Sequence, residues 1–171
     1  MKTLFNRNFS VKSYEDPFKF WVVDDIFEEN FTKEVLHKWP KRSDSRWNDG
    51  FSVIGNKENM LERKMLAMSG KQNMPDFFRT LIEGLNSEEI LKVYEKITGM
   101  KNLKVDPNWR WAGLRETLPG GFQLVHSDAR KHAETGMRKE LTFLFYFRDS
   151  YDKKRDEGCL EIWNDDVTKM I

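Results

Sequence analysis

The residues best suited to chemistry in this sequence lie at one tripeptide, His126-Ser127-Asp128. Residues at i and i+2 of a β-strand point to the same face, so the imidazole of His126 and the carboxylate of Asp128 can converge on one metal ion. An imidazole and a carboxylate are two of the three ligands in the 2-His-1-carboxylate set that holds Fe(II) and leaves positions open. The tripeptide alone is a weak signal, and taken alone a structural or surface role is the simpler explanation.

The segments around this tripeptide are expected to be β-strands. After residue 102 the apolar period changes from that of a helix toward that of a strand, which predicts strands over 109–118 and 122–128. Residues 141–147 (LTFLFYF) are apolar on both faces and predict a central strand between two layers. A last strand is expected over 158–163.

The first hundred residues are expected to form a mainly helical layer that supports these strands. Apolar spacing and turn signals predict one short strand, 18–27, and then helices up to Trp39, over 60–68, over 75–85, and from the capping residue Asn86 to Gly99. The predicted fold class is α+β, in a single domain over 1–171, with the helical layer in about 1–100 and an antiparallel β region in about 103–171.

Composition excludes several classes of protein. The 171 residues include 29 Lys and Arg against 28 Asp and Glu, so the formal net charge is +1 and no basic field attracts nucleic acid. A single cysteine, Cys159, excludes an intrachain disulfide framework. The sequence contains neither a signal peptide nor the stretch of about 20 apolar residues that a membrane span needs. We therefore expect a cytoplasmic protein that binds neither membrane nor nucleic acid.

The order of motifs resembles the 2-oxoglutarate/Fe(II)-dependent dioxygenase superfamily, in particular its prolyl-4-hydroxylase-like branch. A Pro-Gly turn at 119–121 precedes the H-x-D tripeptide. A basic residue, a Leu-Thr strand ending in Tyr146-Phe147, and a Gly-x-Leu strand at 158–160 follow in the order typical of that family. The family's second glycine in the last motif is Cys159 here.

The resemblance implies a double-stranded β-helix, or jelly roll, with flanking helices. It implies Fe(II) as cofactor and 2-oxoglutarate as cosubstrate, and hydroxylation of an unspecified small molecule or peptide. In this reading His126 and Asp128 are iron ligands, and Tyr146 hydrogen-bonds the distal carboxylate of 2-oxoglutarate. Thr142 shares a strand face with Tyr146 and is expected to line the same pocket.

Two parts of the family's site have no counterpart in the sequence. The third iron ligand is a His well downstream of H-x-D, and an Arg or Lys beyond it anchors 2-oxoglutarate. The sequence ends at Ile171 without either, so the jelly roll is expected to be incomplete at its C-terminus and the chain inactive or impaired. Uncovered strands at 141–147 and 158–163 then predict self-association through sheet edges.

Two alternatives stay open. The chain can be a non-catalytic jelly-roll module that binds a partner and has lost the catalytic strands. It can also be a cupin-like metalloprotein that uses His126 and His132 with Asp128.

Overall fold

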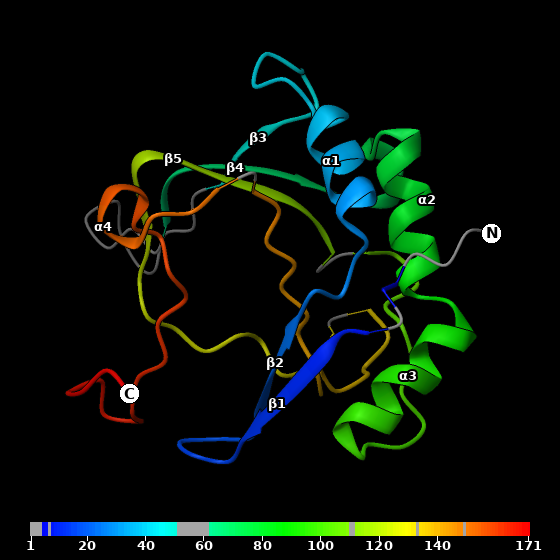
Figure 1. Cartoon of the computed structure of the whole chain (residues 1–171), viewed down its shortest axis with the longest axis vertical. Helices are drawn as coiled ribbons and strands as arrows, with labels where there is room; N and C mark the ends of the chain where they lie inside the picture. Colours follow the sequence, from blue (N-terminus) through cyan, green and yellow to red (C-terminus); the bar gives the residue numbers. More distant parts are fainter. Residues whose placement is uncertain (1–4, 7, 51–61, 110–111, 133, 149) are drawn as a thin grey trace.

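The computed structural model describes residues 5–6, 8–50, 62–109, 112–132, 134–148 and 150–171. In this part of the chain, four α-helices and five strands form a mixed structure, which confirms the α+β class (Figure 1). The strands make one two-stranded and one three-stranded sheet, and neither closes into a jelly roll within the described residues. No helix in these ranges has the length and apolarity to cross a bilayer.

Both sheets are antiparallel. In the smaller sheet β1 (Ser10–Tyr14) pairs with β2 (Phe20–Asp24), and Ser10 lies opposite Asp24. In the larger sheet the order is β3 (Asn48–Gly50), β4 (Glu62–Ser69) and β5 (Gly113–Gln123), so β4 is central. Strands as well as helices therefore occupy the first hundred residues.

The helices are α1 (Glu29–His37), α2 (Asp76–Leu85), α3 (Glu88–Thr98) and the short α4 (Lys153–Asp156), with a 3-10 turn over Lys71–Asn73. The first three match the predicted helices up to Trp39, over 75–85 and from Asn86 to Gly99, whereas α4 lies where no helix was predicted. The N-cap of α3 is Ser87 rather than the predicted Asn86, because the Ser87 hydroxyl accepts from the amide of Ile90 at 3.4 Å. As predicted, α3 ends at Gly99, whose φ of 75° suits glycine.

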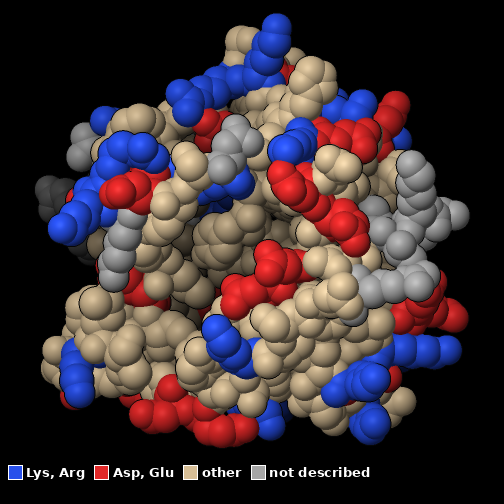
Figure 2. Space-filling model, in the orientation of Figure 1, with Lys and Arg blue, Asp and Glu red and all other residues tan. Residues whose placement is uncertain are grey.

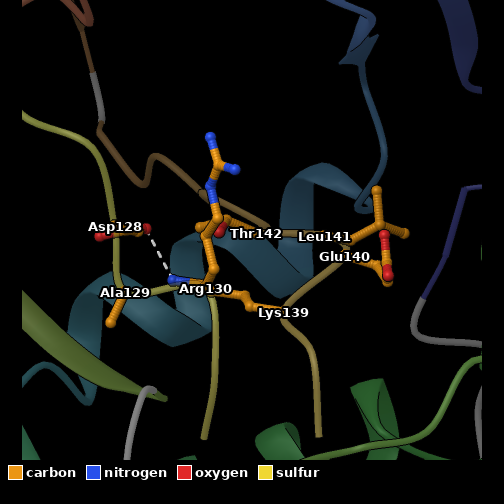
Figure 3. Close-up of a pocket in the computed structure, with 7 residues that line it drawn as sticks. All are labelled: Asp128, Ala129, Arg130, Lys139, Glu140, Leu141 and Thr142. Carbon is orange, nitrogen blue, oxygen red and sulfur yellow. Dashed lines mark hydrogen bonds and ion pairs between the residues drawn. The ribbon is translucent and has the colours of Figure 1, made fainter.

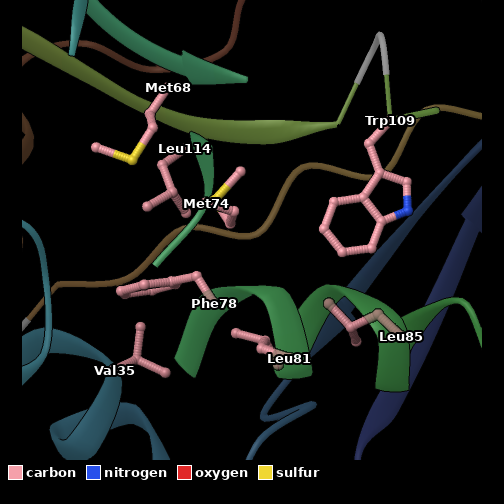
Figure 4. Close-up of a cluster of buried hydrophobic side chains, with 8 residues drawn as sticks. All are labelled: Val35, Met68, Met74, Phe78, Leu81, Leu85, Trp109 and Leu114. Carbon is pink, nitrogen blue, oxygen red and sulfur yellow. The ribbon is translucent and has the colours of Figure 1, made fainter. Parts of the chain in front are cut away.

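The core lies between α2 and the larger sheet (Figure 4). Met68 of β4 and Leu114 of β5 are paired residues, and both point toward Phe78 of α2. Val35 of α1 closes one end of this layer, and Trp109 lies at the other. The first and second halves of the chain are thus joined through one apolar layer.

The helix predicted over 60–68 is wrong where the structure describes it, since Glu62–Ser69 form β4. Met65 and Met68 are both buried, although residues three apart lie on opposite faces of a strand. A central strand covered on both faces loses the alternation that marks a half-buried strand, so its pattern can be mistaken for a helix. Residues 60 and 61 lie outside the described ranges.

The turn predicted at 119–121 is a bulge inside β5 rather than the end of a strand. Thr117 pairs with Met65 and Phe122 pairs with Arg63, so four residues of β5 lie opposite Lys64 alone. Gly120 has a φ of 72°, and a Cβ on Gly121 would lie 2.8 Å from the backbone oxygens of Leu118 and Lys64. Glycine is therefore required at both positions, which is the physical basis of the predicted turn.

The three remaining strand predictions are wrong in the described residues. β5 ends at Gln123, so 124–128 is not a strand, and neither 141–147 nor 158–163 forms one, apart from a single bridge between Trp163 and Met170. Residues 124–128 and 141–147 pair with no strand in the described part of the chain, and 158–163 has only the short contact in which the amide of Ile171 donates to the carbonyl of Ile162 at 2.9 Å. The strand predicted over 109–118 begins at Gly113, and its residues 110 and 111 lie outside the described ranges.

Replacing the central core ring should cost much of the stability. Phe78 is 1% exposed, so we expect Phe78→Ala to lower the free energy of unfolding by about 3–5 kcal/mol. The matched control is Phe18→Ala, because Phe18 is 55% exposed and its loss should cost about 0.5 kcal/mol or less. Urea unfolding measures both, and equal losses would contradict the core assigned to α2.

Candidate metal site

His126 is held in an orientation that suits a metal ligand. Its Nδ1 lies 2.8 Å from the carbonyl oxygen of Leu124. A carbonyl can only accept a hydrogen bond, so Nδ1 carries the proton and donates it. In the neutral ring this leaves the lone pair on Nε2, and such a backbone contact is the usual way in which a metal-binding histidine is oriented.

Asp128 lies on the Nε2 side of this ring. The distance from His126 Nε2 to Asp128 Oδ1 is 3.7 Å. Metal bonds to imidazole nitrogen and carboxylate oxygen are about 2.0–2.2 Å each, so one ion can bridge two atoms at this separation. The predicted convergence of the two side chains is present, although both residues follow β5 instead of lying in a strand.

Asp128 already has a cationic partner in Lys139. Lys139 Nζ lies 2.6 Å from Asp128 Oδ2, and Figure 3 shows this contact among the residues that line a small pocket. The hydrogen bond from Lys139 is the main cause that lowers the pKa of Asp128, with smaller contributions from the charges of His126 and Arg115. A metal ion at this carboxylate would have to share it with Lys139 or displace that side chain.

The pocket beside this ion pair has a volume of about 150 Å³. Its charged walls are Asp128, Arg130, Lys139 and Glu140, and Thr142 lies beside them (Figure 3). The structure therefore brings Thr142 to the same pocket as Asp128. On the face seen in Figure 2 the molecule is hollowed at its centre, with acidic side chains next to the hollow.

Tyr146 does not line this pocket. It lies on an open side of the chain, where 66% of the residue is exposed. Partial burial of its hydroxyl group, and then the nearby Cys159, raise the pKa of this tyrosine. The structure thus separates Tyr146 from Asp128 and Thr142, with which the sequence analysis grouped it.

His132 has a structural role that no motif in the sequence indicates. It is 1% exposed, and its Nδ1 accepts the backbone N–H groups of Glu134 and Thr135, both at 3.2 Å. Its Nε2 lies 3.2 Å from Asp106 Oδ1. Both ring nitrogens are therefore engaged by groups other than His126 and Asp128, which disfavours the cupin-like alternative.

The hairpin that His132 supports brings Lys139 to Asp128. Three backbone hydrogen bonds close it. The amides of His132, Gly136 and Lys139 donate to the carbonyls of Met137, His132 and Arg130 at 2.8, 2.9 and 2.8 Å. A residue outside the hairpin also holds it, because the side-chain amide of Asn108 donates to the carboxylate of Glu134 at 2.7 Å. No sequence signal marks this arrangement, because the buried histidine lies in a stretch that reads as charged loop.

The donor set is incomplete for a three-ligand iron site. No cluster of three His, Cys, Asp or Glu side chains placed to hold a metal ion occurs among the described residues. His126 and Asp128 fit two of the ligand positions, and the described part of the chain does not supply the third. We therefore derive no catalytic step at this site.

The comparisons with known proteins assign the chain to no family. No family model, no curated protein and no solved structure matches the chain. The resemblance to the dioxygenases rests on the residues named above.

Removing the lysine partner should change the titration of Asp128. We expect Lys139→Met, which keeps most of the side-chain stem, to raise the pKa of Asp128 toward that of an ordinary aspartate. Because the pair lowers the pKa in the folded chain, it stabilises the fold above the unfolded-state pKa, and this contribution is lost as the pH falls through the folded value.

Carboxyl ¹³C NMR titration of Asp128 measures this change. Lys154→Met is the control, since Lys154 is exposed on α4 and its side chain should leave the titration unchanged. An Asp128 pKa that is the same with and without Lys139 would contradict the ion pair.

Proposed function

We propose that this chain is an Fe(II)- and 2-oxoglutarate-dependent oxygenase whose metal ligands include His126 and Asp128. The observation that supports this most directly is the state of His126. Its Nδ1 proton is used by a backbone carbonyl, and its Nε2 lies 3.7 Å from the Asp128 carboxylate. A histidine that only stabilised a loop would not need its second nitrogen to lie beside a carboxylate.

The adjacent pocket supports an anionic cosubstrate. Arg130 and Lys139 supply positive charge, and Thr142 supplies a hydroxyl group that can donate to a carboxylate. In the proposal, these groups bind and orient 2-oxoglutarate next to Asp128. When bound, Fe(II) and 2-oxoglutarate would supply the oxygen chemistry for hydroxylating a small molecule or peptide. Tyr146, being exposed, contributes only if its segment changes position.

We propose further that the fold is an incomplete jelly roll. The antiparallel pairing of β4 with β5, followed by the strand-favouring sequences at 141–147 and 158–163, is consistent with part of such a fold. Because the described residues supply two ligands, we expect the chain alone to bind metal weakly and to turn over slowly.

The alternative is a non-catalytic binding module. The contact between Lys139 and Asp128 favours it, because a carboxylate neutralised at 2.6 Å by a lysine needs no metal ion. In that case the binding function of the protein should be unchanged in His126→Ala.

Metal binding separates these two proposals. We expect anaerobic Fe(II) titration, followed by tryptophan fluorescence, to show binding that His126→Ala and Asp128→Asn each weaken at least about tenfold. His37→Ala is the matched control, because His37 is an exposed histidine on α1 and should leave the affinity unchanged. Equal affinity in all four proteins would exclude a site at His126 and Asp128 and favour the binding module.

Turnover tests the missing ligand separately. We expect the chain with Fe(II), ascorbate and 2-oxoglutarate to form little succinate, since a two-ligand site holds iron poorly. Rapid succinate formation with tight metal binding would show that a complete site exists and would contradict the two-ligand description.

A further inference from the structure

The backbone of Leu141–Phe147 is unusually open for so apolar a segment. Among the described residues, no backbone hydrogen bond to this segment is present. Its sequence, LTFLFYF, contains no charge, no proline and no glycine, and is rich in residues that favour strands. These are the features of an edge that invites pairing with another strand.

The side chains of this segment alternate between a packed side and an open side. Phe145 and Phe147 lie 5.4 and 5.5 Å from the ring of Phe27, and Phe143 lies 4.0 Å from the ring of Tyr94. On the open side, Leu144 and Tyr146 are 55% and 66% exposed. The segment is therefore attached to its own chain mainly through Phe145 and Phe147, since Phe143 is 43% exposed, and Leu144 and Tyr146 stay open to a partner.

The charges that flank the segment are arranged so that it can pair with itself. An antiparallel pair centred on Leu144 places Glu140 opposite Arg148 at both ends, since each lies four residues from the centre. The same register places Thr142 opposite Tyr146 and Leu144 opposite Leu144. Opposite charges and apolar residues directly across a ladder both stabilise antiparallel strands.

We propose that Leu141–Phe147 is a dimerisation strand that pairs antiparallel with the same segment of a second copy of this chain, in the register centred on Leu144. The contact is closed by a two-fold axis, so each copy provides the same surface. Glu140 and Arg148, which contact Arg138 and Asp156 within the chain, meet each other across the two-fold axis. The partner is a second copy of the chain, because Glu140 and Arg148 carry opposite charges at equal distances from Leu144.

Charge exchange tests both the partner and the register. We expect light scattering to show a dimer whose dissociation constant rises about tenfold or more in Glu140→Lys and in Arg148→Glu, because each places like charges opposite at both ends. The double variant Glu140→Lys/Arg148→Glu should restore the dimer. The control Glu29→Lys/Lys33→Glu exchanges an exposed pair on α1, whose atoms lie 2.7 Å apart, and should leave dimerisation unchanged.

Disulfide trapping tests the centre of the register. Cys159 is the only cysteine, so Cys159→Ser gives a background without thiols. In that background we expect Leu144→Cys to crosslink to itself on oxidation, since the two Cβ atoms would lie about 4.5–5.5 Å apart. Thr142→Cys should crosslink only when it is mixed with a Tyr146→Cys chain.

Three results would overturn the proposal. A strict monomer at high concentration would show that the segment does not pair. Open-ended fibres in place of a dimer would show unspecific strand stacking, and a dimer unaffected by either charge change would show that another surface is used. Glu140 and Thr142 also line the pocket proposed for 2-oxoglutarate, but the oligomeric state is measured without metal or cosubstrate, so its failure is distinguishable from failure of the oxygenase proposal.

Discussion

The pairing of β4 with β5 is the interaction on which the other described parts of this protein depend. It joins a strand from the first half of the chain to one from the second, and places Met68 beside Leu114 above α2. Without this ladder, the residues after Gln123 would be attached mainly through side chains. These are the rings of Phe143, Phe145 and Phe147 on Tyr94 and Phe27, and the contacts of His132 with Asp106 and of Glu134 with Asn108. Every candidate site residue lies in that later part of the chain.

Local physics explains which parts of the fold could be predicted. Helices α2 and α3 are amphipathic and end at clear signals, so periodicity finds them. The strand β4 has apolar residues on both faces, so its sequence lacks the two-residue period by which a strand is recognised. The segment 141–147 carries strand-forming residues but has no partner strand within the described residues, and a single sequence shows the propensity without showing the partner.

In the candidate site, contacts between residues close in sequence could be predicted, and contacts between distant residues could not. His126 and Asp128 are two residues apart, so local geometry is enough to bring them together. Lys139 is eleven residues from Asp128 and arrives through a hairpin supported by a buried histidine, which no spacing rule reveals. Thr142 reaches the pocket and Tyr146 does not. The prediction that both line one pocket assumed a strand over 141–147, and the described structure has no strand there.

The bulge in β5 has a consequence for how this chain tolerates changes in length. Thr117 and Phe122 are five positions apart on β5, whereas their partners Met65 and Arg63 are two positions apart on β4. The extra residues fit because Gly120 has a positive φ and because the backbone approaches Gly121 too closely for a side chain. A single insertion or deletion between 118 and 121 therefore falls in the one stretch of β5 without ladder pairs, and it would change the length of the bulge before it changed the pairs on either side. The same stretch sets the register in which the chain leaves the sheet toward His126.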